Sequence, residues 1–237
     1  MFSVIYKLQH CQFHLSDSNE LLIDAYLAVR DNVDELIELL SSYQNTLEEF
    51  ERVRAWDRDD EYSKRSRTQK ASRLIYLNKT CYNGLFRVND KGEFNVPFGK
   101  YNSPTICDEA NLRACSQALQ GVQIEVLEFD QVLTRIGRDD FVYLDPPYEP
   151  ISVTSSFNSY TTRKFDEVDQ TRLFKFCQRL TSKRARFLLS NSSAAWLRLL
   201  YEKESKFTVG RVKARRSINS DGKGRGEINE ILVRNYR

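Results

Sequence analysis

The stretch FVYLDPPYEP, Phe141 to Pro150, decides how the rest of the chain is interpreted. Four apolar or aromatic residues, typical of a buried strand, run directly into Asp145 and then into Pro146, Pro147 and Tyr148. In open α/β sheets, ligands bind beyond the carboxyl ends of the strands, and Asp145 would lie at such an end. The position therefore favours a binding or catalytic site.

The four residues from Asp145 to Tyr148 offer hydrogen-bond acceptors and a flat ring. The prolines fix φ and lack N–H donors, so their carbonyl groups remain as acceptors held in one direction. The carboxylate adds further acceptors and the tyrosine an aromatic face, which together suit a planar heterocycle carrying an NH₂ group. Two acceptors would also stabilise positive charge as it develops on that nitrogen. The alternative is a strand that ends in a polyproline turn, with Asp145 as a cap and Tyr148 in surface packing.

Strand-like and helical segments alternate along the chain and predict an α/β sheet. Strands are expected at 12–17, 122–128, 140–145, 185–193, 206–214 and 228–236, the last two as an antiparallel pair. Helices are expected at 19–43 with a break near Asp31 and Asn32, within the charged segment 46–80, at 111–119, at 166–183 with Asp166 as N-cap, and at 194–203. The turn signal NDKGE predicts a hairpin within 81–101.

Composition limits the classes of protein to consider. The chain has 237 residues, which suits one domain or one domain with a sizeable insertion, and its net charge of +3 is too small to indicate a nucleic-acid partner by itself. Five cysteines without a CxxC pair and two histidines predict free thiols in a reducing cytoplasm and no metal site. No run is long and apolar enough to span a membrane.

The block LNKTCYNGLFRVNDKGEFNVPFGKY, Leu77 to Tyr101, is the most specific of the motifs. Together with LSDSNELLI, FVYLDPPYEP, SFNSYT, LLSNSS, RRSINS and EILVRNY, it resembles the Dam-type DNA adenine-N6 methyltransferases over nearly the whole chain. The resemblance implies methyl transfer from S-adenosylmethionine to N6 of adenine in double-stranded DNA, at GATC or a close relative. It also implies a Rossmann-like methyltransferase domain (1–40 and 120–237) and a helical and hairpin target-recognition domain (41–119).

Catalytic and cofactor-binding roles follow from the same resemblance. It assigns the catalytic motif to Asp145, Pro146, Pro147 and Tyr148, with Asp145 also near the cofactor. Asp17 matches the acid that binds the ribose hydroxyls of S-adenosylmethionine, although the residue type equally fits a helix N-cap. Two further residues match the lining of the adenine pocket, for which an ordinary strand end is the alternative: Glu128 and Phe129.

The hairpin resembles the family's target-recognition element. Arg87 matches the arginine that reads guanine, which fits a bidentate contact with O6 and N7 in the major groove. A surface arginine in a turn is the alternative for Arg87, and a small apolar core is the alternative for the aromatic and aliphatic contacts. The implied contacts are Leu85 and Pro97 to a thymine methyl, Tyr82 and Asn83 in the gap left by the extruded adenine, Lys100, Arg215, Arg216 and Ser217 to phosphates, and Tyr160 near the flipped base.

Two motifs of the family are absent from this sequence: the aromatic-Gly-Gly-Lys segment and the FxGxG turn, since the first glycine is Gly84. The resemblance then implies that the central first strand is missing. Unpaired buried polar groups cost about 1–3 kcal/mol each, against about 5–15 kcal/mol for a whole domain. We therefore expect this chain alone to be poorly stable and nearly inactive, as a truncated reading frame. The alternatives are an inactive DNA-binding remnant and one half of a split enzyme completed by a second polypeptide.

Overall fold

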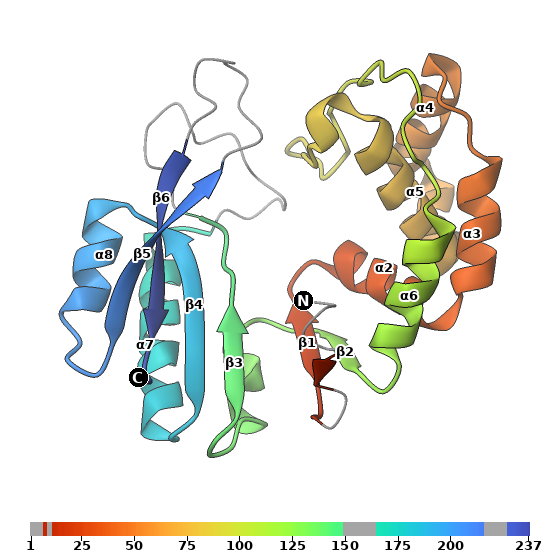
Figure 1. Ribbon diagram of the computed structural model, residues 1–237. Coiled ribbons are helices and arrows are strands. Elements are labelled where there is room, and N and C mark those ends of the chain that lie inside the picture. The colour runs from red at the N-terminus through yellow and green to blue at the C-terminus, as the bar shows by residue number, and fades with distance from the viewer. Residues whose placement is uncertain (1–6, 9–10, 149–164, 216–226) are drawn as a thin grey trace. The chain divides into compact units, whose positions relative to one another are not determined.

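The computed structural model describes residues 7–8, 11–148, 165–215 and 227–237, without the side chains of 214–215 and 227–228 (Figure 1). The described residues form two compact units, one up to Glu128 and one from Phe129 onward. Both units combine helices with β-strands, so the predicted α/β class is confirmed. The Rossmann-like arrangement and the missing first strand stay predictions.

The first unit contains a short parallel sheet of two strands, β1 (His14–Asp17) and β2 (Gln123–Val126). Asp17 pairs with Val126, so both strands end at the same edge of the sheet. The chain between them forms the helical part of the unit. Its elements are α2 (Glu20–Asp31), α3 (Val33–Ser42), α4 (Leu47–Arg54), η1 (Ala55–Arg58), η2 (Asp60–Lys64), α5 (Arg67–Thr80), η3 (Tyr82–Gly84) and α6 (Glu109–Leu119).

Local sequence accounts for the helix boundaries of this unit. The helix predicted from residue 19 breaks where expected, because Asn32 ends α2 and begins α3. Asn19 caps α2, and Ser66 opens α5 with a capping box that pairs it with Gln69. The charged segment 46–80 is helical as predicted, in four consecutive pieces.

One hydrophobic core joins the helices to the two-stranded sheet. Ile23 of α2, Phe50 of α4, Leu77 of α5 and Ile124 of β2 belong to a single buried cluster. This packing stabilises the position of the helical segment relative to the strand ends. The predicted domain boundaries at residues 40 and 120 stay predictions.

The predicted hairpin forms after α5, although its pairing is limited to two antiparallel bridges, Val88 with Phe94 and Cys81 with Phe98. The NDKGE turn closes through Asn89, whose side-chain oxygen accepts from the main-chain N–H of Lys91 and of Glu93. Gly99 permits the close approach of the two arms. A Cβ atom there would lie 2.7 Å from the carbonyl oxygen of Cys81.

The second unit contains a four-stranded sheet in the order β3-β4-β6-β5. Strand β3 (Phe141–Leu144) is parallel to β4 (Arg186–Ser192), and β6 (Glu227–Arg234) lies antiparallel between β4 and β5 (Thr208–Arg215). The predicted antiparallel pair at the end of the chain is confirmed. Helix α7 (Glu167–Ser182) packs on β4 and α8 (Ala195–Glu202) on β5 (Figure 1). Asp166 caps α7 as predicted, and a short helix η4 (Gln131–Thr134) precedes β3.

Candidate active site and nucleic-acid interface

Asp145 directly follows β3, at the edge where β3 and the parallel strand β4 both end. Three residues later, the hydroxyl oxygen of Tyr148 lies 2.5 Å from the hydroxyl oxygen of Ser190 in β4. The same tyrosine hydroxyl donates to Glu230 Oε2 in β6 over 3.3 Å. Two neighbouring strands therefore hold the end of the DPPY segment at the carboxyl edge of β3.

The main chain of the segment is also held from the helical layer. Gln170 of α7 donates from Nε2 to the carbonyl oxygen of Pro147 over 3.3 Å. The side-chain oxygen of Gln170, Oε1, accepts from Asn191 Nδ2 over 3.0 Å, and both residues are fully buried. Because buried amides retain few alternative partners, this pair fixes the orientation of the second proline.

Two carboxylates, those of Asp145 and Glu230, determine the electrostatic potential around the segment. Burial and the neighbouring Glu230 carboxylate raise the pKa of Asp145 above its ordinary value. Burial raises the pKa of Tyr148 to about 12, against the effect of its hydrogen bond to Ser190 and with a further contribution from the charges of Asp145 and Glu230. Tyr148 therefore stays protonated at neutral pH, while the two carboxylates create a negative potential that favours a cationic centre.

Asp17 and Glu128 lie at the carboxyl edge of the two-stranded sheet in the first unit. Asp17 is the last residue of β1, and its Oδ1 accepts from the main-chain N–H of Asn19 over 2.7 Å. Glu128 follows β2 by two residues and is half-buried. The predicted N-cap alternative for Asp17 is wrong in detail, because the N-cap of α2 is Asn19. The predicted contact of Asp17 with the ribose of the cofactor stays a prediction.

Phe129 is placed in an aromatic cluster of the second unit. Its ring packs edge-on against Phe165 and Phe176, at 6.1 and 5.7 Å between ring centroids. The guanidinium of Arg172 lies over the same ring, 5.0 Å from its centroid. These contacts favour the alternative of ordinary packing at a strand end, and the predicted place of Phe129 in a cofactor pocket stays a prediction.

The hairpin presents its predicted guanine reader on the surface. Arg87 is exposed, and its Nε donates to Asn95 Oδ1 on the opposite arm over 2.7 Å. The main-chain N–H of Asn95 donates in turn to the Arg87 carbonyl over 3.0 Å. A bidentate contact with O6 and N7 of a guanine would therefore use the two Nη groups.

The other predicted contacts of the hairpin divide into exposed and packed residues. Tyr82 is 46% exposed, and Asn83 beside it has a left-handed φ of 56°. Pro97 and Lys100 are exposed as well. Leu85 is instead partly buried against the core of the unit, which supports the alternative of a small apolar core for this residue.

The remaining predicted DNA contacts are not placed. Tyr160, Arg216 and Ser217 lie outside the described residues. Arg215 is the last residue of β5, where its main chain pairs with Glu227 of β6. These four residues stay predictions.

Three polar residues that support Tyr148 and Pro147 were not predicted from the sequence. They are Gln170, Ser190 and Glu230. The strand predicted at 185–193 runs from apolar into polar residues, and this change was the available signal for Ser190. Glu230 stood inside a quoted motif without an assigned role, because antiparallel insertion of β6 beside β4 is a tertiary feature.

None of the helices in the described part of the chain has the length and apolar character needed to cross a membrane. Nowhere in it do three or more histidine, cysteine, aspartate or glutamate side chains gather as a metal site.

This chain is similar to known proteins over nearly all of its residues. Residues 2–218 match the family model described as D12 class N6 adenine-specific DNA methyltransferase. The chain is 41% identical to the Type II methyltransferase M.MjaIII of Methanocaldococcus jannaschii, over 100% of this chain and 84% of the relative. It is 38% identical to the Type II methyltransferase M1.LlaDCHI of Lactococcus lactis subsp. cremoris, over 94% and 78%. It is 33% identical to the DNA adenine methylase of Escherichia coli (strain K12), over 98% and 82%.

Proposed function

The chain belongs to the D12 class N6 adenine-specific DNA methyltransferases, and from this premise we propose that it methylates N6 of adenine in double-stranded GATC sites with S-adenosylmethionine as donor. The observation that carries the proposal is the DPPY segment at the carboxyl edge of β3, with Tyr148 held by Ser190 and Glu230. An adenine within a duplex must leave the base stack to reach such a site.

The residues at the end of β3 supply acceptors for the adenine amino group. The Asp145 carboxylate accepts one N6 hydrogen. Because the Pro147 carbonyl already accepts from Gln170, we assign the second acceptor to the carbonyl of Pro146. Two acceptors draw the nitrogen towards tetrahedral geometry and make its lone pair available.

Tyr148 and Glu230 complete the site around the base. The Tyr148 ring stacks on the adenine, and its hydroxyl contacts keep the ring in one orientation. The charges of Asp145 and Glu230 stabilise the positive charge that develops on N6, so a strong general base is not required. When bound, S-adenosylmethionine supplies an electrophilic methyl group. Asp17 would hold its ribose hydroxyls, and Glu128 would lie near its adenine.

DNA recognition is assigned to the hairpin. Arg87 reads a guanine, and Tyr82 with Asn83 fills the gap left by the extruded adenine. Lys100 holds a phosphate, as do Arg215, Arg216 and Ser217 near the end of β5, while Pro97 contacts a thymine methyl.

A methyl-transfer assay tests this function. The protein is incubated with labelled S-adenosylmethionine and either a GATC duplex or a duplex in which that adenine is replaced by purine, which lacks the amino group. Label recovered as N6-methyladenine from the first duplex alone supports the proposal. Titration of S-adenosylmethionine by calorimetry separates the alternatives: a chain that binds the duplex but not the cofactor is a DNA-binding remnant or one half of a two-chain enzyme.

A further inference from the structure

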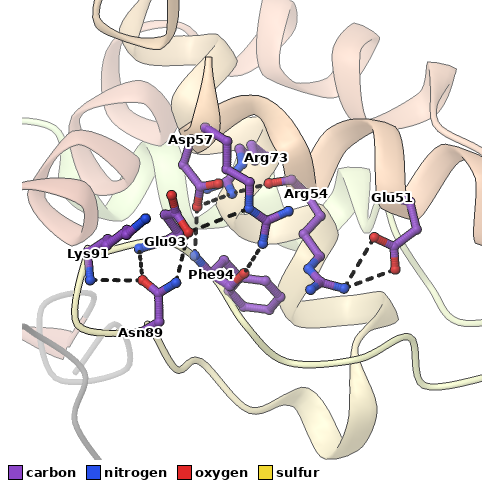
Figure 2. Close-up of polar contacts among 9 residues, drawn as sticks. Glu51, Arg54, Asp57, Arg73, Asn89, Lys91, Glu93 and Phe94 are labelled. Carbon is purple, nitrogen blue, oxygen red and sulfur yellow. Dashed lines mark hydrogen bonds and ion pairs between the residues drawn. The ribbon is translucent and has the colours of Figure 1, made fainter. Parts of the chain in front are cut away.

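Several residues of the hairpin that carries Arg87 contact the helical part of the first unit, and among them Phe94 directly precedes Asn95. The main-chain N–H of Phe94 donates to Asp57 Oδ2 over 2.7 Å, and Arg58 donates from Nη2 to the Phe94 carbonyl over 3.2 Å (Figure 2). The Phe94 ring is buried and packs against Phe86. Both polar main-chain groups of Phe94 are therefore bonded to side chains of η1, which precedes the hairpin by more than 20 residues.

Asp57 is itself held by a buried arginine. The Nη2 atom of Arg73, on α5, lies 2.6 Å from Asp57 Oδ2, and the two side chains are 3% and 9% exposed. Arg73 also donates to the carbonyl of Val53 over 3.0 Å. It donates to the carbonyl of Arg54, at the end of α4, over 2.8 Å (Figure 2). A guanidinium is planar and rigid, so three acceptors define its direction. The Asp57 carboxylate is thereby fixed relative to α4 and α5.

The residue after Phe94 contacts the guanine reader. Asn95 accepts from Arg87 Nε through its side chain and donates to the Arg87 carbonyl through its main chain. A two-stranded hairpin is at best marginally stable by itself. The contacts made at Phe94, next to Asn95, therefore contribute to the direction of the hairpin and with it to that of the Arg87 guanidinium.

We propose that Asp57 and Arg73 are positioning residues for guanine recognition, which set the direction of Arg87 through the main chain of Phe94 and the side chain of Asn95. The inference rests on the proposed function, in which Arg87 reads a guanine. A bidentate contact to O6 and N7 requires both Nη groups to meet the base edge at once, and a functional constellation tolerates a displacement of only about 0.5 Å. Neither Asp57 nor Arg73 needs to touch DNA for this role.

The test measures discrimination in binding, so that it does not depend on methyl transfer. Dissociation constants are determined by fluorescence anisotropy for a GATC duplex and for the same duplex with 7-deazaguanine, which lacks the N7 acceptor. We expect the wild-type protein to bind the guanine duplex about fivefold or more tightly. In Asp57→Asn and in Asn95→Ala, the ratio of the two dissociation constants should fall towards one, while affinity for the 7-deazaguanine duplex changes little.

Two comparisons separate positioning from general loss of structure. The control Glu51→Gln removes an exposed ion pair with Arg54 on α4, beside the network, and should keep the wild-type ratio (Figure 2). The double variant Asp57→Asn/Arg87→Ala should give the same ratio of dissociation constants as Arg87→Ala alone, because both changes act on the contact between Arg87 and the guanine. Circular dichroism confirms that each variant keeps the wild-type helix content.

The inference is overturned if folded Asp57→Asn and Asn95→Ala retain the wild-type ratio, or if Asp57→Asn lowers the ratio further in the Arg87→Ala background. Equal dissociation constants of the wild-type protein for the two duplexes would also overturn it, because they would show that no contact is made with N7 of the guanine. Failure of the proposed function is recognised separately, since it is the absence of N6-methyladenine in the transfer assay.

Discussion

The hydroxyl oxygen of Tyr148 lies 2.5 Å from that of Ser190, a residue 42 positions further along the chain. The bond joins the segment after β3 to the neighbouring parallel strand β4, at the edge where both strands end. Asp145, three residues before Tyr148, is thereby confined to the same edge. The chemistry of the site consequently depends on the pairing of the sheet as well as on the DPPY segment.

Replacing Asp145 with alanine tests the role of its carboxylate directly. We expect kcat for N6 methylation to fall by about a hundred- to a thousand-fold, because one of the two acceptors that stabilise charge on N6 is lost. Affinity for the GATC duplex should stay within about twofold to threefold of the wild-type value, which is the usual effect of substituting an exposed residue. Anisotropy and a single-turnover assay measure the two quantities. Unchanged turnover in the variant would exclude the proposed mechanism.

Replacing Glu230 with glutamine should shift the pH dependence of the reaction. Asp145 accepts from the amino group only when ionised, so kcat/KM should rise with pH through the Asp145 pKa. Burial and the Glu230 charge raise that pKa. Removing the charge leaves burial alone, and the acidic limb of the profile should move to lower pH. Glu202→Gln, at an exposed pair with Arg198 on α8, is the matched control and should leave the limb in place. A shift to higher pH would contradict the electrostatic account.

Tyr148 allows its ring to be separated from its hydroxyl. Tyr148→Phe keeps the stacking surface and removes the contacts with Ser190 and Glu230. Tyr148→Ala removes both, and stacking of a base on an aromatic ring is worth roughly 1–3 kcal/mol. We expect kcat/KM to fall much further in the alanine variant than in the phenylalanine variant. Equal losses in single-turnover assays would show that the hydroxyl, rather than the ring, is the essential part.

Lys100 and Arg87 should differ in how they affect binding. Lys100 is assigned to a phosphate, so Lys100→Ala should weaken binding to all duplexes alike and reduce the salt slope of log K by about 1. Arg87→Ala should instead cost about 1–3 kcal/mol with GATC duplexes and little with unrelated ones. Salt titrations with both duplexes make the distinction. Arg113→Gln on α6 removes one positive charge from an exposed ion pair and serves as control.

Local signals predicted most of the elements and the DPPY segment. Asp166 and Ser66 carry capping signals that depend only on neighbours in sequence, and the apolar run before Asp145 marks its strand. Gln170 and Glu230 were missed because they reach the site from α7 and β6, and no local pattern indicates which strands pair. The same limit applies to Asp57, because nothing in the charged sequence of 46–80 indicates that this side chain is only 9% exposed.

The Asp57–Arg73 pair also yields a prediction for stability. Replacing Arg73 with methionine keeps much of the side-chain volume but leaves the Asp57 carboxylate buried without its cationic partner, and Asp57 Oδ1 already lacks a hydrogen-bond partner among the described residues. Breaking a buried pair in this way costs about 3–5 kcal/mol. Glu51→Gln, at an exposed pair on α4, should cost at most about 1 kcal/mol. Urea denaturation followed by circular dichroism measures both. Equal losses of unfolding free energy in the two variants would contradict the prediction. They would show that the buried pair contributes no more to stability than an exposed pair.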